Sequence, residues 1–364
     1  MNLTVLSVAY PFAPVGPDAA GGAEQVLAQL DAALVHAGAR SIVVGCEGSR
    51  AAGILLPVPR ADGPLTRQRI AAGRAQHARA IGEALRRWPV DLVHMHGVDF
   101  QTYLPPAGVP VLATLHLPIS FYASEALRPS RPEVWLNCVS RSQHANCAGN
   151  PRLVRPIENG VPVELFARRH AKRDFALVLA RICPEKGIHL AIAAAKAAGI
   201  PLLIAGEVFP YPDHQRYFAE EIAPQLDRWR RFIGPVDFRR KRRLLAAARC
   251  LLVPSLIPET SSLVAREALA SGTPVIALAR GALIDTVEPG RTGFLVSDEI
   301  EMAEAIGRTG DIDRDLCRRT AQVRFSAHAM IEQYFALYEA ISDRRRLRSA
   351  SMPAYTGTAP MIMG

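Results

Sequence analysis

Leu-Leu-Val-Pro-Ser-Leu-Ile-Pro-Glu-Thr-Ser-Ser-Leu-Val-Ala-Arg-Glu-Ala-Leu-Ala-Ser-Gly-Thr-Pro-Val-Ile-Ala, residues 251–277, is the stretch that decides the fold. It opens with a short apolar run, which predicts a buried parallel strand. Good helix formers follow over residues 263–270, and Ser261 or Ser262 is the expected N-cap. Gly272 ends this helix and another apolar run begins soon after it, so the stretch predicts a βαβ unit.

Two acids flank the predicted start of this helix. Glu259 lies in the loop before it, and Glu267 lies within it, with seven residues between them. The N–H groups at a helix N-terminus and the helix dipole favour a phosphate, and carboxylates accept hydrogen bonds from hydroxyls. The arrangement therefore suits a ligand with a diphosphate in the middle and a sugar at each end. The alternative is an ordinary βαβ unit with two surface acids.

This layout resembles the Glu-x7-Glu motif of retaining glycosyltransferases with the GT-B architecture, especially family 4. The resemblance implies that Glu259 faces the transferred sugar and Glu267 the nucleotide ribose. It also implies that the backbone amides of Ser262, Leu263 and Val264 serve the diphosphate. The chain departs from the family at Ser261-Ser262, where Phe-Gly is common, so we expect a different sugar pocket.

Composition limits the other classes of protein. A length of 364 residues predicts two domains, and 49% apolar residues indicate a globular chain. No apolar run approaches the roughly 20 residues that span a bilayer, and the N-terminal run reads as a strand rather than a signal peptide. The six cysteines form no Cys-x-x-Cys pair, which predicts neither a zinc site nor a disulfide framework and fits a cytoplasmic protein.

The net charge of +9 is spread along the chain, which argues against nucleic acid as a partner. Residues 67–88 have helical spacing and carry six arginines. We interpret them as a solvated face; the alternative is a surface that meets anionic lipid. Residues 239–243, Arg-Arg-Lys-Arg-Arg, open another predicted helix and are also interpreted as solvated.

In the first half of the chain, Gly21 and Gly22 follow the first predicted strand, but the dinucleotide fingerprint Gly-x-Gly-x-x-Gly is absent there. They resemble the glycine loop that approaches the donor diphosphate in the family; a plain loop is the alternative.

His94 and His96 share one face of a predicted strand, and without an evident third ligand they predict no metal site. The resemblance places His96 on the acceptor side and His116 near the donor sugar; a structural role is the alternative for His116.

In the second half, Arg181 and Lys186 follow a predicted strand at residues 175–180. They match the two basic positions that neutralise the donor diphosphate in the family, and a charged surface loop is the alternative. The end of the strand around Gly234 contacts the base in the family. Gly281-Ala282 stands where the family often has Gly-Gly near the donor, and Asp285 where it often has Glu.

We therefore predict an α/β protein of the GT-B class, with two Rossmann-like domains facing each other across a cleft. The expected divisions are an acceptor domain at 1–168, a nucleotide-sugar domain at 169–325, a helix at 326–342 that packs back on the first domain, and a tail at 343–364. The predicted activity is retaining transfer from a nucleotide-diphosphate sugar, with UDP the commonest choice in the family, to a sugar, lipid-linked or small-molecule acceptor. No cofactor or metal is expected. A nucleotide-sugar 2-epimerase and a non-catalytic nucleotide-sugar-binding protein remain as alternatives.

Overall fold

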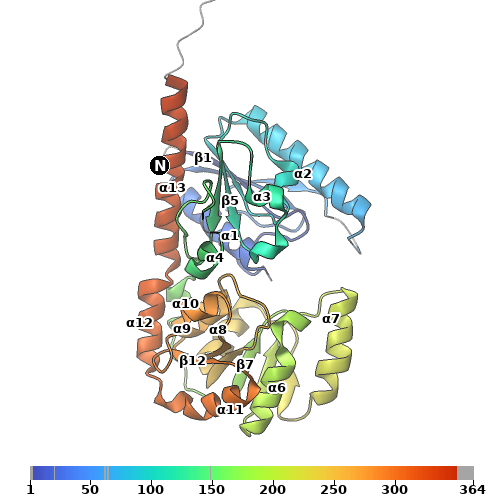
Figure 1. Ribbon diagram of the computed structural model, residues 1–364, viewed down its shortest axis with the longest axis vertical. Helices are drawn as coiled ribbons and strands as arrows, with labels where there is room; N and C mark the ends of the chain where they lie inside the picture. The colour runs from blue at the N-terminus through green and yellow to red at the C-terminus, as the bar shows by residue number, and fades with distance from the viewer. Residues whose placement is uncertain (1–2, 20, 61–62, 64, 148, 351–364) are drawn as a thin grey trace, which may run out of the picture.

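The computed structural model describes residues 3–19, 21–60, 63, 65–147 and 149–350. They form two six-stranded parallel sheets, one in each half of the molecule (Figure 1). The first sheet comprises β1 (Thr4–Val8), β2 (Arg40–Cys46), β3 (Ile54–Val58), β4 (Leu92–Met95), β5 (Val111–Leu115) and β6 (Val134–Cys138). The second comprises β7 (Ala176–Leu179), β8 (Leu202–Ala205), β9 (Arg230–Phe232), β10 (Cys250–Val253), β11 (Val275–Leu278) and β12 (Gly293–Val296).

Both sheets have the same topology. The first runs β3-β2-β1-β4-β5-β6, and the second, read from its other edge, runs β9-β8-β7-β10-β11-β12. Each is the doubly wound order 3-2-1-4-5-6, in which the winding reverses between the first and fourth strands. Ligands of such sheets bind at that reversal, outside the carboxyl ends of the strands. The predicted fold class, two Rossmann-like α/β domains, is confirmed.

Helices cover both faces of each sheet. Those of the first half are α1 (Gly22–His36), α2 (Arg67–Arg87), α3 (Ser124–Leu127) and α4 (Arg141–Ala145). The next helix, α5 (Val163–Phe166), packs on the second domain, whose core includes Phe166. Those of the second are α6 (Ile188–Ala197), α7 (Pro212–Tyr217), α8 (Phe238–Ala247), α9 (Leu263–Ala270), α10 (Ala282–Thr286), α11 (Glu299–Gly307) and α12 (Arg314–Arg324). In the first domain α2 packs on one face of the sheet, while α1 and the last helix, α13 (Ala327–Ala350), pack on the other.

The helix α13 leaves the second domain and runs along the first, as the red helix in Figure 1 shows. Its Tyr338 hydroxyl lies 2.8 Å from His94 Nδ1, and its Tyr334 hydroxyl accepts a hydrogen bond of 2.9 Å from Asn137 Nδ2. The prediction that the C-terminal helix packs back on the first domain is therefore confirmed. The helix continues beyond the predicted end at residue 342 to Ala350, and residues 351–364 of the predicted tail lie outside the described residues.

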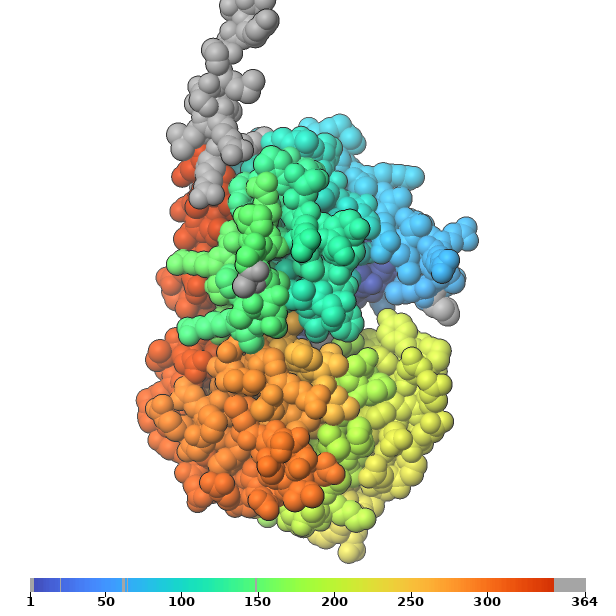
Figure 2. Space-filling view, viewed as in Figure 1, coloured from blue at the N-terminus to red at the C-terminus, as the bar shows by residue number. Residues whose placement is uncertain are grey.

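Sequence reasoning missed the strand β3, whose sequence Ile-Leu-Leu-Pro-Val contains a proline. Pro57 lacks an N–H group, so it fits a strand only at an edge, and β3 is the edge strand of its sheet. Within the described residues, no helix combines the length and the apolar character needed to cross a membrane. Figure 2 shows that the two domains touch over a broad area and part at one side, where a notch separates the blue surface from the yellow surface.

Candidate functional site

The reversal point of the second sheet carries a buried ion pair. Lys186 ends η3 (Pro184–Lys186), which follows β7, and Glu259 lies in the loop that follows β10. Lys186 Nζ lies 2.5 Å from Glu259 Oε1, and Ser255 Oγ donates to the same oxygen. The Lys186 and Glu259 side chains are only 19% and 13% exposed. Two residues that are 73 positions apart in sequence are thus joined where this topology forms ligand sites.

Glu259 is held as a carboxylate. Burial opposes its ionisation, but the charge of Lys186 and the hydrogen bonds from Lys186 and Ser255 outweigh that effect and lower its pKa. The backbone of Glu259 is fixed by Ala282, whose N–H donates to the Glu259 carbonyl at 2.7 Å. Gly281 has a φ of 57°, and a Cβ there would lie 2.3 Å from that carbonyl oxygen, so the position requires glycine. The structure therefore brings Gly281-Ala282 against Glu259.

The start of α9 lacks a side-chain cap. Ser262 is the N-cap residue, as one of the two predicted positions, but its side chain makes no capping hydrogen bond. Ser262 has a φ of 51° and is the one non-glycine residue with a positive φ in the described part of the chain. The N–H groups of Ser262, Leu263 and Val264 donate to no acceptor among the described residues. These three N–H groups point from a helix N-terminus directly after Glu259 and are donors of the kind that can bind an anion.

Glu267 is deeper than the sequence suggested. Its side chain is 5% exposed, and its Oε1 lies 2.6 Å from Lys241 Nζ. Burial raises the pKa of Glu267, and the Lys241 charge opposes that rise. The interpretation of residues 239–243 as solvated is wrong for Lys241, whose ammonium also lies over the rings of Phe166 and Phe238. The signal was the spacing of Phe238, Lys241 and Leu245, which puts all three on the buried face of α8.

Arg181 is exposed and makes no salt bridge with any described residue. Its charge acts on Glu259 within its own domain and on Glu24 of α1 in the other domain. It therefore faces both sides of the space between the domains. Gly234 follows β9 with a φ of 70°, and its carbonyl accepts a hydrogen bond from Gly206 N at 3.0 Å.

On the first domain, Gly21 and Gly22 follow β1 and start α1. A Cβ on Gly22 would lie 3.2 Å from the Leu263 side chain, so the glycine loop approaches the N-terminus of α9. Leu263 packs against the cores of both domains. The structure thus places the glycine loop beside this helix; its expected approach to a donor diphosphate stays a prediction. Glu24, which the sequence did not single out, is buried here, and burial raises its pKa.

The three predicted histidines have different surroundings. His94 is enclosed, with its ring nitrogens bonded to Tyr338 and to Thr114, and serves to hold α13 against the sheet. His96 Nδ1 lies 3.0 Å from His116 Nε2, and the two rings are stacked. The remaining nitrogens, His96 Nε2 and His116 Nδ1, have no partner among the described residues. Burial lowers the pKa of His116 to about 3, so this pair is neutral at physiological pH.

The two sides of the site touch each other. Thr260, the residue after Glu259, donates its hydroxyl to the backbone carbonyl of His116 at 2.8 Å. This bond joins the loop of the second domain that carries the acid to the strand end of the first domain that carries the histidine. The structure therefore gathers Glu259, Lys186, the α9 N-terminus, the glycine loop and His116 around one interdomain space.

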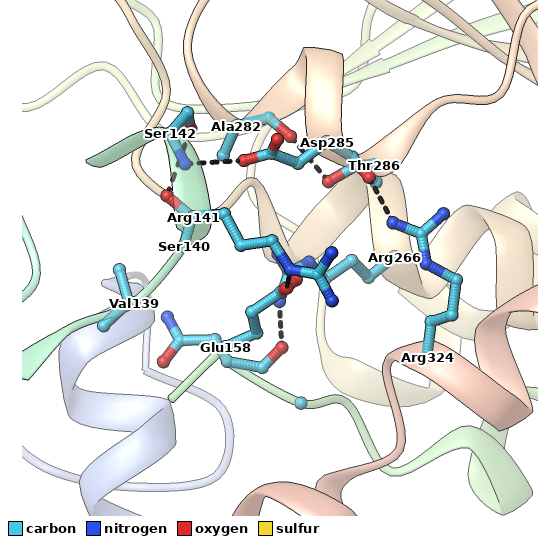
Figure 3. A network of polar contacts seen from close by, with 12 residues as sticks. Val139, Ser140, Arg141, Ser142, Glu158, Arg266, Ala282, Asp285, Thr286 and Arg324 are labelled. Carbon is cyan, nitrogen blue, oxygen red and sulfur yellow. Dashed lines mark hydrogen bonds and ion pairs between the residues drawn. The ribbon is translucent and has the colours of Figure 1, made fainter. Parts of the chain in front are cut away.

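A second set of contacts lies where the chain passes between the domains (Figure 3). Arg266 of α9 is fully buried; it donates to the Asn159 carbonyl and lies 3.4 Å from Glu158. Asp285 accepts a 2.9 Å hydrogen bond from Ser142 N of the first domain rather than facing the Glu259 loop. Sequence reasoning missed Arg266, because its partners come from the other domain and no local pattern announces them.

Comparison with known families agrees with these motifs. Residues 20–165 match the family described as Glycosyltransferase Family 4, and residues 173–310 match Glycosyl transferases group 1. The two matches are adjacent, and each covers the main part of one domain. Together they contain Gly21, Gly22, His96, His116, Arg181, Lys186, Gly234, Glu259, the start of α9 and Glu267.

Sequence matches to individual relatives cover a smaller share of the chain than matches to solved structures do. The chain is 31% identical over 208 residues to the MMP alpha-(1->4)-mannosyltransferase of Mycolicibacterium hassiacum, covering 53% of this chain and 49% of that protein. The matches span about half or less of the length of the first curated relatives. AviGT4, a glycosyltransferase involved in avilamycin A biosynthesis, has a TM-score of 0.69 and 27% identity, covering 94% of this chain and 98% of its own. Sucrose-phosphate synthase from Thermosynechococcus elongatus has a TM-score of 0.75 at 23% identity, covering 96% and 100%, which shows the shared fold.

Proposed function

This chain belongs to the group 1, family 4 glycosyltransferases, and we propose that it transfers a sugar from a nucleotide-diphosphate sugar to an acceptor hydroxyl. The observation that carries the proposal is the Lys186–Glu259 pair beside the unpaired N–H groups of α9. Together they offer a carboxylate for sugar hydroxyls and positive charge for a diphosphate. We take a UDP-sugar as the donor, as the family resemblance suggests, and a sugar, lipid-linked or small-molecule hydroxyl compound as the acceptor.

We further propose that the transfer retains the anomeric configuration. The bond between the anomeric carbon and the diphosphate oxygen breaks, and the acceptor oxygen bonds to that carbon on the same face. The acceptor proton passes to the departing diphosphate. Glu259, kept ionised by Lys186, stabilises the positive charge that develops at the sugar, while Lys186 and Arg181 stabilise the leaving diphosphate.

The first domain suits the acceptor in this proposal. His96 is assigned to the acceptor and His116 to the hydroxyls of the donor sugar. Both are neutral, and each has one ring nitrogen without a partner among the described residues, which matches the hydrogen-bonding needs of uncharged hydroxyls. Glu267 is assigned to the ribose and Gly234 to the base. Because fixed cationic groups and N–H donors meet the diphosphate, we propose that the transfer requires no metal cofactor.

We place the protein in the cytoplasm, with reversible contact at an anionic membrane surface as a further part of the proposal. The exposed Arg67, Arg79 and Arg86 of α2 would make that contact. Sedimentation with vesicles that contain an anionic lipid, compared with neutral vesicles, tests it. Equal sedimentation with both kinds of vesicle would exclude an electrostatic contact.

The decisive experiment measures donor binding and donor consumption across a panel of nucleotide sugars, followed by NMR of the product's anomeric centre. A glycosyltransferase releases the nucleoside diphosphate, and a retaining one gives a product with the donor's anomeric configuration. An epimerase would instead change the configuration at C2, and a binding protein would leave the donor intact. No observation in the structure favours either alternative.

Lys186→Ala tests the charge assignment. We expect turnover to fall by about 10²-fold or more, because the variant lacks the positive charge that stabilises the departing diphosphate in the transition state. Lys196→Ala, on the exposed side of α6, is the matched control and should leave turnover unchanged. Calorimetry with a nucleoside diphosphate should show weaker binding for Lys186→Ala alone. Equal binding by the two variants would remove Lys186 from the diphosphate site.

A further inference from the structure

Three potential metal ligands of different chemistry meet beside the site described above. They are Cys183 and Glu185, which flank the start of η3, and His214 of α7. The Cys183 sulfur, a Glu185 carboxylate oxygen and a His214 ring nitrogen all lie within 4.8 Å of one another. This is the one group of three such residues in the described part of the chain. Two of its members lie between Arg181 and Lys186 in sequence.

The His214 ring is held in place without using its nitrogen Nδ1. Tyr211 packs against the ring edge to face, with ring centroids 5.1 Å apart, and Phe209 lies on another side at 6.2 Å. His214 Nδ1 is buried and has no hydrogen-bond partner among the described residues. A buried, unpartnered ring nitrogen is costly to leave unsatisfied, and a bound cation would remove that cost.

Cys183 is 1% exposed, and its thiol interacts with the Glu185 carboxylate. Burial raises the pKa of the thiol to about 11, so a bound ion would have to replace its proton. Glu185 and His214 line a cavity of about 690 Å³ between η3 and α7, together with Tyr211 and Asp213. The cavity gives an ion a path to the ligands and leaves space for water as a further ligand.

We propose that Cys183, Glu185 and His214 form a binding site for a Zn²⁺-class ion. A soft sulfur, an imidazole and one carboxylate are the donors that zinc accepts, whereas Mg²⁺ and Ca²⁺ take oxygen ligands. Tetrahedral zinc with bonds of about 2.0–2.3 Å places its ligand atoms roughly 3–4 Å apart, inside the 4.8 Å within which these three atoms lie, so at most small rotations of the side chains close the site. The fourth ligand is a water from the cavity.

Occupancy would tie the loop that carries Arg181 and Lys186 to α7. The loop is already held where Leu256 N donates to the Glu185 carbonyl at 2.8 Å and where Ile182 N donates to the Glu207 carbonyl at 2.9 Å. The ion would add a further link, from this loop to α7. Arg181 acts electrostatically on all three ligand residues and opposes a cation. The site does not depend on the proposed transfer reaction, since it needs only these ligands.

The test titrates Co²⁺, and then competing Zn²⁺, into the full chain after treatment with a chelator and a phosphine reductant. A thiolate bound to Co²⁺ gives a ligand-to-metal charge-transfer band, which reports a Cys183 bond independently of enzymatic activity. We expect the band in the wild type at one equivalent, its loss in Cys183→Ser, and at least about tenfold weaker binding in His214→Ala. Arg181→Ala should bind more tightly at low salt, because a repelling charge is gone.

Two controls address other thiols and imidazoles. Cys147→Ser removes a thiol outside the cluster, and His170→Ala removes an exposed imidazole; both should keep the band and the affinity of the wild type. Circular dichroism checks that each variant is folded. Absence of a charge-transfer band in the wild type, or a band that persists in Cys183→Ser, would overturn the proposal.

Discussion

The two domains share one strand order but differ in the chemistry at their carboxyl edges. At the reversal of the first sheet lie a glycine loop and a neutral, stacked histidine pair. At the reversal of the second lie the ion pairs Lys186–Glu259 and, beneath it, Lys241–Glu267. Topology therefore places both sites. The first edge also carries an ion pair, Arg74–Asp99, so the difference lies in the groups nearest the Glu259 loop: a neutral histidine pair on the first domain and charged side chains on the second.

This difference matches the two substrates of a glycosyl transfer. A nucleotide-diphosphate sugar brings charge that must be neutralised and that moves as the bond breaks, whereas an acceptor hydroxyl brings none. Fixed charges act best when they are already oriented, and both lysines are held by buried carboxylates.

The largest effect is expected from Glu259→Gln, which removes charge from the second domain's edge and keeps size. Turnover should fall by about 10²–10³-fold, as when a preorganised stabilising group is lost. The affinity for free nucleoside diphosphate should stay unchanged, because Glu259 is assigned to the sugar. Turnover is measured at saturating donor, so that the loss reports on the transition state.

Glu304→Gln, an exposed substitution on α11, is the control for the loss of one carboxylate anywhere in the domain. If Glu259→Gln keeps full turnover, the edge of the second domain does not act through this charge. A loss of nucleoside diphosphate affinity as large as the loss of turnover would instead place Glu259 at the nucleotide.

The next effect concerns the deeper pair. Glu267→Ala should weaken nucleotide binding by about tenfold to a hundredfold, since a hydrogen bond to a charged acceptor is worth about 1.5–3 kcal/mol. Calorimetry with free nucleotide measures it. Lys241→Met breaks the same ion pair while keeping the acid, so it should lower stability without an equal loss of affinity. Equal losses of affinity in both variants would show that the pair only supports α9.

The sequence predicted structure correctly wherever a single segment determines that structure by itself. Apolar runs predicted the strands that flank Glu259, and the order of the motifs along the chain predicted which loops share an edge. It failed where the partner came from elsewhere. Arg266 reads as a surface residue of α9 but is buried against Asn159 and Phe325, which belong to other segments.

Local patterns also failed where a residue departs from its usual conformation. Ser262 has the sequence of an N-cap, yet a positive φ turns its side chain away from the capping geometry. His94 and His96 were rightly placed on one face of a strand, with ring centroids 4.0 Å apart. Their roles differ because of α13. Its Tyr338 hydroxyl forms a hydrogen bond with His94, whereas His96 pairs with His116.

A smaller effect tests the neutral histidine pair of the first domain. The pKa of His116 is lowered to about 3, so between that pH and about 6.5 the unfolded chain binds a proton that the folded chain does not. Stability should therefore fall as pH falls through this range. His116→Asn should lose about 2 kcal/mol less than the wild type between pH 7 and pH 5. Urea unfolding at both pH values, followed by tryptophan fluorescence, measures the difference; identical losses would mean that His116 is protonated in the folded protein.

The smallest effect concerns the backbone at the start of α9. Ser262 holds a φ of 51°, a conformation that costs a non-glycine residue about 1–2 kcal/mol, while glycine adopts it freely. Ser262→Gly should therefore raise the free energy of unfolding by about 1 kcal/mol, after allowing for the greater freedom of glycine in the unfolded chain.

Ser262→Ala is the matched variant, because it removes the hydroxyl and keeps the Cβ, and it should give no such gain. An equal gain in both variants would trace the cost to the hydroxyl instead of the backbone. Nucleoside diphosphate affinity should survive in both, since the proposed contact is made by the N–H groups at positions 262–264. The backbone N–H groups of residues 262–264 would then bind the diphosphate whatever the side chain at position 262. That side chain would affect only the stability of the backbone conformation at the start of α9.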